Sequence, residues 1–258
     1  MAVGAARPVL NLLRLSRLPI YTQLNLEEAL LRATKDNWLI VNDGAFSPSI
    51  VIGISGRPAE LVHCKSALES GVPALRRFTG GGTVVVDADT VFATLIMEGS
   101  ALPDVECFPQ PIMKWTEQLY RPAFAAAGCK DFGLRENDYI VAGGRKVGGN
   151  AQAITGKRWL HHTSFLWDYD PARMALLRHP PKAPKYREGR GHDDFVTRLC
   201  EVLHPEHGRR RLVENFGIAA AEMGFAVQER TLADAAPALS HRPLLLGTKP
   251  LDLREFLQ

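Results

Sequence analysis

The sequence lacks the cysteine patterns that mark a metal site or a disulfide framework. Its four cysteines stand far apart, with no CxxC pair and no other metal-ligand spacing: Cys64, Cys107, Cys129 and Cys200. This arrangement predicts reduced thiols rather than the cross-links of a small secreted domain. Long apolar runs are missing as well. None reaches the roughly 18 residues that span a bilayer, so we expect no membrane segment.

An excess of charge is also missing. The 258 residues include 31 Lys+Arg against 28 Asp+Glu, a formal net charge of +3. This balance is too weak to indicate nucleic-acid binding, so we expect no nucleic-acid partner, although a local basic cluster could still hold phosphates. With 46% hydrophobic and 23% charged residues, the composition suits one large domain.

Acidic residues are absent from the first 26 positions, where Arg7, Arg14 and Arg17 occur. Such a composition is typical of a mitochondrial or plastid transit peptide. The alternative is that "LLRLSRLPI" forms a first strand with its arginines in water. Because residues 12–20 look like part of a fold, we expect at most a short targeting segment over residues 1–11. A single domain would then occupy residues 12–258.

Hydrophobic periodicity, glycines and prolines divide the chain into helices and strands. We expect helices over residues 24–35, 58–70, 109–127, 194–203 and 209–223, followed by a short tail. We expect strands over residues 37–43, 49–55 and 90–97, the first two adjacent, and a β-rich region over residues 130–166. Strands clustered in the middle, with helices around them, favour an α+β fold with a largely antiparallel or mixed sheet.

Three consecutive glycines follow a short β-rich run in "RRFTGGGTVVVD", residues 76–87. Strand side chains alternate, so Arg77 and Thr79 should face one side and Phe78 the other, toward the core. The glycines would let the backbone approach a ligand and present N–H donors, as in an anion-binding nest. Taken alone, the stretch is equally compatible with a glycine-rich hairpin whose arginines lie in water.

A second glycine-rich cluster covers residues 135–167, "RENDYIVAGGRKVGGNAQAITGKRWLHHTSFLW". Gly143-Gly144 between two β-like runs predicts a two-residue hairpin turn. In that register Asp138 lies on one face of the hairpin. Three other polar side chains share the opposite face: Asn137, Lys146 and Asn150. Gly148 and the glycine after it leave room for a bulky ligand beside the lysine, which is typical of a ligand face.

Four ordered segments resemble the biotin/lipoate protein ligase superfamily, and specifically its lipoate–protein ligase A branch. They are "RRFTGGGTVVVD", the Asn-Asp of "REND", "GRKVGGNAQ" and "HHTSFLW", and the resemblance covers residues 15–177. Biotin ligases share the Asn-Asp and a lysine strand. Their first loop, however, is an Arg-Gly-rich GRGR pattern, and their lysine strand ends differently. The resemblance therefore favours lipoate over biotin, which stays a minor alternative.

The resemblance implies an α+β fold with a ligase-like, largely antiparallel sheet flanked by helices, and a catalytic domain over residues 12–258 with a C-terminal helical extension. It also implies a two-step reaction in which ATP with Mg²⁺ activates lipoate to lipoyl-adenylate. The acyl group then passes to a lysine of a lipoyl domain. The implied partners are the 2-oxoacid dehydrogenase complexes and the glycine cleavage H protein, which favours a mitochondrial location over a cytoplasmic one.

The same resemblance implies roles for individual residues. Lys146 would be the catalytic cation that bridges the substrate carboxyl oxygen and the α-phosphate. Asp138 would bind the substrate or ATP and would also contact Mg²⁺. The remaining residues implied to bind lipoate or ATP are Arg77, Thr79, Gly80, Gly81, Gly82, Asn137, Gly148, Asn150, His162 and Ser164. Composition, rather than the resemblance, suggests one more role: the proline-rich loop 182–190 carries Lys182, Lys185, Arg187 and Arg190, which could close over the triphosphate.

Two departures leave alternatives open. In this branch a histidine often precedes the aspartate of the first motif, and Val86 stands there in this sequence. The family's C-terminal accessory domain also has no obvious counterpart after Leu177. A separate accessory subunit, an ATP-independent octanoyl- or lipoyltransferase, and a non-catalytic scaffold are the resulting alternatives. For a transferase, Cys107 is a candidate thiol nucleophile.

Overall fold

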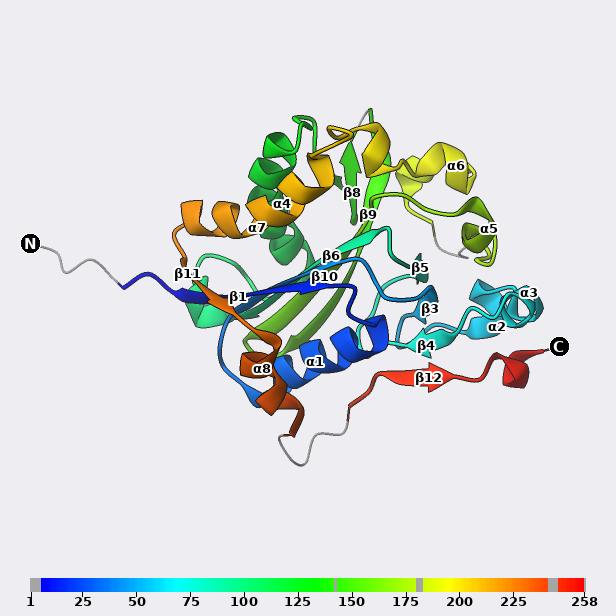
Figure 1. Cartoon of the computed structure of the whole chain (residues 1–258), viewed down its shortest axis with the longest axis horizontal. Coiled ribbons are helices and arrows are strands. Elements are labelled where there is room, and N and C mark those ends of the chain that lie inside the picture. Colours follow the sequence, from blue (N-terminus) through cyan, green and yellow to red (C-terminus); the bar gives the residue numbers. More distant parts are fainter. Residues whose placement is uncertain (1–5, 142, 180–182, 241–245, 258) are drawn as a thin grey trace, which may run out of the picture.

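The computed structural model describes residues 6–141, 143–179, 183–240 and 246–257. In this part of the chain, eight strands form one sheet and four form a smaller one (Figure 1). The order in the large sheet is β11-β1-β2-β6-β10-β9-β8-β7, and in the small sheet β12-β4-β3-β5. Pairs of described strands are antiparallel except β1–β2, β1–β11 and β3–β4. The predicted α+β fold with a largely antiparallel sheet is confirmed.

The strands of the large sheet are β1 (Val9–Ser16), β2 (Trp38–Asp43), β6 (Thr90–Glu98), β7 (Gly133–Arg135), β8 (Asp138–Val141), β9 (Arg145–Thr155), β10 (Arg158–Leu166) and β11 (Ala226–Arg230). Those of the small sheet are β3 (Ser49–Ile52), β4 (Ala74–Arg76), β5 (Val84–Val86) and β12 (Lys249–Leu251).

The described α-helices are α1 (Ile20–Ala33), α2 (Pro58–Leu61), α3 (Cys64–Glu69), α4 (Pro109–Ala126), α5 (Pro171–Met174), α6 (His192–Phe195), α7 (Gly208–Glu222) and α8 (Leu232–Ala235). Short 3₁₀ turns occur at Gly99–Ala101, Lys185–Arg187, Leu199–Glu201, Ala236–Ser240 and Leu253–Phe256. None of the helices in these ranges is long and apolar enough to cross a bilayer.

Helices cover both faces of the large sheet, with α4 and α7 on one side and α1 and α8 on the other (Figure 1). The alternation along β6 explains this layering. Val91, Leu95 and Met97 join the core cluster beneath α4 and α7, whereas Ile96 joins the cluster beneath α1. Because successive strand residues face opposite sides, a largely apolar strand such as β6 is buried on both.

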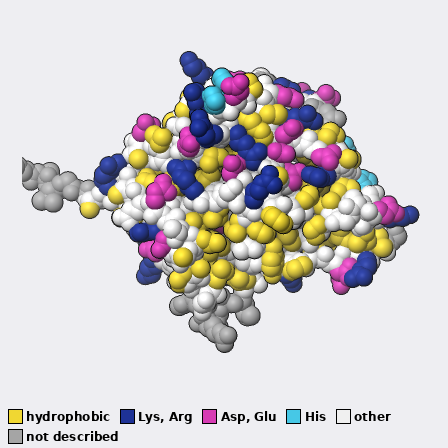
Figure 2. Space-filling model, viewed as in Figure 1, with side chains coloured by type: hydrophobic (Ala, Val, Ile, Leu, Met, Phe, Trp, Pro, Cys, Tyr) yellow, Lys and Arg dark blue, Asp and Glu magenta, His cyan; other side chains and the backbone are white. Residues whose placement is uncertain are grey.

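The surface agrees with the balanced composition. On the face shown in Figure 2, basic and acidic side chains are interspersed, and hydrophobic side chains gather across its lower half. This face therefore presents no extended patch of one charge sign, as expected from the net charge of +3.

Two expected elements are divided by tertiary hydrogen bonds. The helix predicted over residues 58–70 is two short helices, because the chain between them pairs with the 176–177 segment. Val62 forms a bridge with Leu177, and the His63 N–H donates to the Leu176 carbonyl. The helix predicted over residues 194–203 is wrong for the same kind of reason, since Val196 bridges to Lys146 in β9.

Two predictions about the strands were also wrong. The strands predicted as adjacent, β2 and β3, belong to different sheets. The predicted tail after α7 includes two further strands, with β11 parallel to β1 and β12 antiparallel to β4. At the other end, residues 9–11 of the proposed targeting segment lie in β1, and residues 1–5 lie outside the described residues.

Candidate active site

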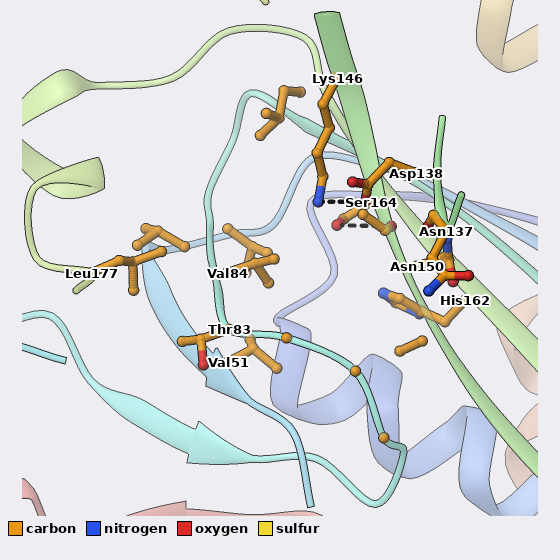
Figure 3. Close-up of a pocket in the computed structure, with 18 of the residues that line it drawn as sticks. Val51, Thr83, Val84, Asn137, Asp138, Lys146, Asn150, His162, Ser164 and Leu177 are labelled. Carbon is orange, nitrogen blue, oxygen red and sulfur yellow. Dashed lines mark hydrogen bonds and ion pairs between the residues drawn. The ribbon is translucent and has the colours of Figure 1, made fainter. Parts of the chain in front are cut away.

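A cavity of about 750 Å³ opens where the two sheets meet. This volume is in the range of small-molecule and cofactor sites. Figure 3 shows its two sides. On one side lie polar residues carried by β8–β10 and the turn before β8: Asn137, Asp138, Lys146, Asn150, His162 and Ser164. Across the cavity lie apolar residues from the small sheet and the α5 region: Val51, Val84 and Leu177.

The predicted residues converge on this cavity, with two exceptions. All of the residues for which the resemblance implied a role line it apart from Thr79 and Gly148. Val86, at the position where the family often has histidine, lies in an apolar cluster with Ile20 and Leu24 of α1. That part of the wall is therefore hydrocarbon rather than imidazole.

The glycine loop between β4 and β5 is closed by Arg77. Its guanidinium donates to the carbonyls of Gly80 at 2.7 Å and Gly82 at 2.7 Å, with a longer contact to Val51. Arg77 is only 4% exposed, and burial lowers its pKa to about 10. The predicted pocket-facing arginine does line the cavity. Its hydrogen bonds, however, go to the loop itself rather than to an open anion site.

The backbone of this loop needs glycine in the middle. Gly81 has φ +94°, a conformation that strains other residues, and it lies against Gly53, whose hypothetical Cβ would be 2.3 Å from the Gly81 carbonyl. A Cβ on either Gly80 or Gly82 would meet nothing within 4 Å, so the loop leaves open space there. Phe78 packs in the core as predicted, and Thr79 is buried away from the cavity.

Lys146 and Asp138 form the charged centre of the opposite wall. Lys146 Nζ lies 2.7 Å from Asp138 Oδ1 (Figure 3), and the two side chains are 25% and 10% exposed. The hairpin prediction placed them on opposite faces, which is wrong. Tyr139 does pair with Gly148 as expected, but the register then shifts so that Ile140 pairs with Lys146. This bulge rotates the strand and brings the carboxylate to the lysine.

The backbone of Lys146 is also held from outside the hairpin. The Thr197 N–H donates to the Lys146 carbonyl at 2.9 Å, at the segment that interrupts the predicted helix of residues 194–203. This hydrogen bond helps to fix the register of β9 at Lys146. The lysine therefore projects into the cavity from a fixed main chain.

The two glycines after Lys146 have different tasks. A Cβ on Gly148 would be 2.8 Å from the ring of Phe165, so this glycine serves core packing and not the ligand face predicted for it. Gly149 lines the cavity, and its Cβ would meet the Lys146 amine only at 3.9 Å. Sequence alone could not tell them apart, because the bulge decides which one faces the cavity.

The amides predicted from the sequence form a rim beside this charge pair. Asn150 Nδ2 donates to the Asn137 carbonyl at 2.6 Å, and Gln110 Nε2 donates to Asn137 Oδ1 at 2.6 Å. Ser164 Oγ lies 3.5 Å from the Gly149 carbonyl, a long contact that leaves its hydroxyl available to a ligand. These residues can supply both donors and acceptors.

His162 contacts a carboxylate that sequence reasoning missed. Its Nδ1 lies 3.0 Å from Glu27 Oε2 and 3.0 Å from Thr94 Oγ1, and Glu27 is fully buried. Gln23 donates to Glu27 at 2.7 Å and accepts from Asn42 at 2.8 Å, so the carboxylate ends a chain of buried polar groups. The available signal was a glutamine and a glutamate four positions apart, Gln23 and Glu27, which lie on one face of a helix.

The neighbouring His161 faces away from the cavity. Its ring contacts Tyr139 Oη at 2.9 Å and Gln152 Nε2 at 2.9 Å, and it is fully buried. Burial, reinforced by His162, lowers the pKa of His161 to about 3, so the ring is neutral near pH 7. Of the two adjacent histidines, one therefore belongs to the cavity and the other to the wall behind it.

The basic loop predicted to close over the triphosphate lies across this wall. Arg187 is buried and lines the cavity, Lys185 is exposed, and Arg190 donates to the Tyr186 carbonyl. Lys182 lies outside the described residues. Glu136 and Tyr186, which make the contacts between this loop and the β8 turn, were not identified from the sequence.

Two other candidate chemistries find little support around the cavity. Cys107 donates to the Lys157 carbonyl and is not among the cavity residues. In the described ranges, no group of three or more His, Cys, Asp or Glu side chains is arranged to hold a metal ion. Among the described residues, the acids that line the cavity are Asp138 and Glu136.

Known proteins share this sequence pattern. A family model described as the lipoyl protein ligase A/B catalytic domain matches residues 19–217. A Plasmodium falciparum protein named inactive lipoate–protein ligase 2 is 24% identical over 250 residues, covering 77% of this chain and 65% of that protein. A lipoate-protein ligase of Bacillus subtilis is 31% identical over 123 residues, which is 47% of this chain and 34% of that protein. The chain thus spans under two thirds of either curated relative.

Solved structures share the fold. A structure described as a bi-partite lipoate protein ligase and its E2 lipoyl domain, from Thermoplasma acidophilum, has a TM-score of 0.71 at 19% identity, covering 91% of each chain. A lipoate-protein ligase A bound with ATP has a TM-score of 0.69 at 18% identity, covering 91% of this chain and 92% of that one. At such identities the similarity establishes the architecture.

Proposed function

The chain belongs to the lipoyl protein ligase A/B catalytic domain family, and from that premise we propose that it is a lipoate–protein ligase. In this proposal ATP activates lipoate as lipoyl-adenylate, and the lipoyl group then passes to a lysine of a lipoyl domain. The acceptors are the lipoyl domains of 2-oxoacid dehydrogenase complexes and the glycine cleavage H protein. The observation that carries the proposal is the Lys146 amine, held 2.7 Å from Asp138 in a cavity whose other side is apolar.

The first step joins two anions. A carboxylate oxygen of lipoate bonds to the α-phosphorus of ATP, the bond from that phosphorus to the bridging oxygen of the β-phosphate breaks, and pyrophosphate leaves. A fixed cation at the reacting atoms is then the main requirement. Lys146 fits this role better than Arg77, because the donors of Arg77 are taken up by the glycine-loop carbonyls.

The second step needs no nucleophile from this chain. The neutral amine of the acceptor lysine attacks the acyl carbon, a C–N bond forms, the bond to the AMP oxygen breaks, and the nitrogen loses a proton to solvent. An ordinary lysine has a pKa of about 10.4, so the neutral amine is the minor form near pH 7. The hydrocarbon chain of the acyl group can pack against the apolar wall formed with Val51, Val84 and Val86.

Asp138 suits Mg²⁺ only together with the nucleotide. Magnesium is usually held by one or two carboxylates plus substrate phosphates, so the Asp138 carboxylate would fit that pattern. Both oxygens of Asp138 already have partners, Lys146 on Oδ1 and Tyr186 on Oδ2. Binding a cation there would require one of these contacts to yield. The ion would neutralise phosphate charge when bound.

The decisive assay contains the purified protein, ATP, Mg²⁺, lipoate and an apo lipoyl domain. We expect pyrophosphate release, lipoyl-adenylate detectable by mass spectrometry, and a lipoylated lysine on the acceptor. Because the similar Thermoplasma structure is described as bi-partite, a candidate accessory subunit belongs in a parallel reaction. Absence of both adenylate and modified acceptor in all reactions would rule out ligase activity.

The same assay distinguishes the alternatives. An ATP-independent octanoyl- or lipoyltransferase would modify the acceptor from octanoyl carrier protein or premade lipoyl-adenylate with ATP left out. Replacing Cys107 with Ala should leave either reaction unchanged, since its thiol does not line the cavity. The name of the Plasmodium relative also makes a non-catalytic role worth testing. A Lys146→Ala variant that fully restores cellular lipoylation would support that role.

A further inference from the structure

One short turn holds Tyr186 of the basic loop from three directions. The Glu136 carboxylate accepts the main-chain N–H groups of Lys185 at 3.0 Å and Tyr186 at 2.9 Å. The Tyr186 hydroxyl donates to Asp138 Oδ2 at 2.9 Å, and the Arg135 guanidinium lies 4.8 Å from the centre of the Tyr186 ring. Within residues 135–138, Glu136 therefore holds the backbone of Tyr186, Arg135 contacts its ring and Asp138 accepts from its hydroxyl.

The local geometry shows that this grip is specific. Glu136 has φ +52°, in the left-handed region that non-glycine residues seldom adopt. Tyr186 is 4% exposed and packs against Phe195, with ring centroids 5.2 Å apart. Burial and the carboxylate of Asp138 raise the pKa of Tyr186, so its hydroxyl keeps the proton that it donates. A loop that only covered the cavity would need none of these arrangements.

Asp138 links this tyrosine to the proposed catalytic cation. Its Oδ2 accepts from Tyr186 at 2.9 Å, and its Oδ1 lies 2.7 Å from Lys146 Nζ. Resting on the proposed ligase function, we propose that Tyr186 is a positioning residue that fixes the Asp138 carboxylate and, through it, the Lys146 amine. The lysine stem has four rotatable carbons, so the position of its amine depends on what holds its far end.

The competing explanation is that Tyr186 only anchors the loop by packing. Tyr186→Phe separates the two, because it keeps the ring between Arg135 and Phe195 and removes only the hydroxyl. Tyr21→Phe is the matched control. It makes the same chemical change on a tyrosine of α1 that is 41% exposed and does not line the cavity.

The first measurement is steady-state adenylate formation followed by pyrophosphate release. We expect Tyr186→Phe to lower kcat about tenfold, the effect of losing one hydrogen bond to a charged group, with the KM values for ATP and lipoate within about twofold of wild type. Tyr21→Phe should match wild type. A wild-type kcat in Tyr186→Phe would overturn the positioning role. So would a lower kcat that comes with a lower melting temperature and a raised KM for both substrates, because that pattern indicates a general structural defect.

The second measurement does not depend on ligase activity. Each protein is treated with a limiting amount of an amine-acylating ester, and the modification of each lysine is followed by peptide mass spectrometry. We expect the Lys146 amine to react several-fold faster in Tyr186→Phe, while the exposed Lys157 reacts at the wild-type rate. In an Asp138→Ala background the tyrosine substitution should change the Lys146 rate no further, because the link between them is gone.

These measurements separate failure of the inference from failure of the proposed function. If the wild-type protein forms no adenylate, the ligase proposal fails, and the labelling rates still decide whether Tyr186 positions Lys146. If adenylate forms normally and Tyr186→Phe changes neither kcat nor Lys146 labelling, the ligase proposal stands and the positioning role is rejected.

Discussion

The two walls of the cavity hold their cations in different ways. Arg77 donates to two carbonyls at 2.7 Å, three and five residues further along the chain, so the glycine loop and its arginine form a local unit. Lys146 depends on distant parts of the chain, with Asp138 8 positions upstream and Thr197 51 positions downstream. The hydrogen bonds of Arg77 therefore stabilise the shape of the glycine loop. Lys146 is held by one ion pair at the edge of the cavity, so its amine can still contact a substrate.

This contrast predicts that substitutions of Lys146 and of Arg77 have different consequences. Loss of Lys146 should affect chemistry more than folding, whereas loss of Arg77 should affect folding first. The side chain of Lys146 is 25% exposed, and Arg77 is 4% exposed, which supports this division.

The largest effect is expected at Lys146. Lys146→Ala should reduce adenylate formation roughly 10³-fold, the upper range for removing one group that stabilises developing charge. Its melting temperature should stay close to that of wild type. Pyrophosphate release under saturating substrates measures the first quantity, and thermal unfolding the second. Retention of more than a tenth of the wild-type rate would contradict the role assigned to this lysine.

Arg77→Ala should instead lower the free energy of unfolding by about 3 kcal/mol, because the carbonyls of Gly80 and Gly82 lose their donors. Denaturant titration of the purified variant measures this. Arg77→Lys keeps the charge but not the planar fork, so it should recover only part of the loss. An Arg77→Ala protein of wild-type stability that makes no adenylate would show that this arginine is a substrate ligand after all.

Gly148 and Gly149 allow folding and ligand binding to be separated within one strand, β9. Gly148→Ala should cost about 2 kcal/mol of stability, because its methyl group would overlap the Phe165 ring. Gly149→Ala meets only ordinary contacts and should fold normally, but it narrows the cavity beside Lys146 and should raise the KM for lipoate. Denaturant titration and steady-state kinetics on both variants test this. Equal stabilities of the two would contradict the observed strand rotation.

The smallest effect concerns His161, which backs the same wall. Its pKa is lowered from 6.5 to about 3 in the folded state, so the unfolded chain binds more protons between these values. Stability should therefore fall as pH drops below 6.5. Between pH 7 and pH 5 the wild type should lose roughly 2 kcal/mol more than His161→Gln. His63→Gln, a change at an exposed histidine, is the control and should follow the wild-type pH dependence.

Sequence reasoning found those cavity residues that belong to a short local pattern. The glycine loop, the Asn-Asp turn, Lys146 and His162 were all identified from short motifs, and most of them line one cavity. It missed residues that reach the cavity residues only through a contact far along the chain. Glu27 is 135 positions from His162, and Tyr186 is 48 positions from Asp138. Neither partner carries a motif of its own.

The face of each strand residue was the other point beyond prediction. An alternation of period two assigns Asp138 and Lys146 to opposite sides, and a single bulge reverses that assignment. The same shift moves Gly148 from the ligand face to the core. A bulge depends on the fit between neighbouring strands, so the local sequence of the hairpin does not reveal it.

Periodicity and short-range backbone preferences were enough to predict the fold class, the family motifs and the types of chemical groups around the cavity. Long-range packing decided how each of the two cations beside the cavity is held. The guanidinium of Arg77 is absorbed by its own loop, and the amine of Lys146 is presented through Asp138. The physical reason is that a buried donor binds whichever acceptor packing brings near it, and packing depends on the whole chain.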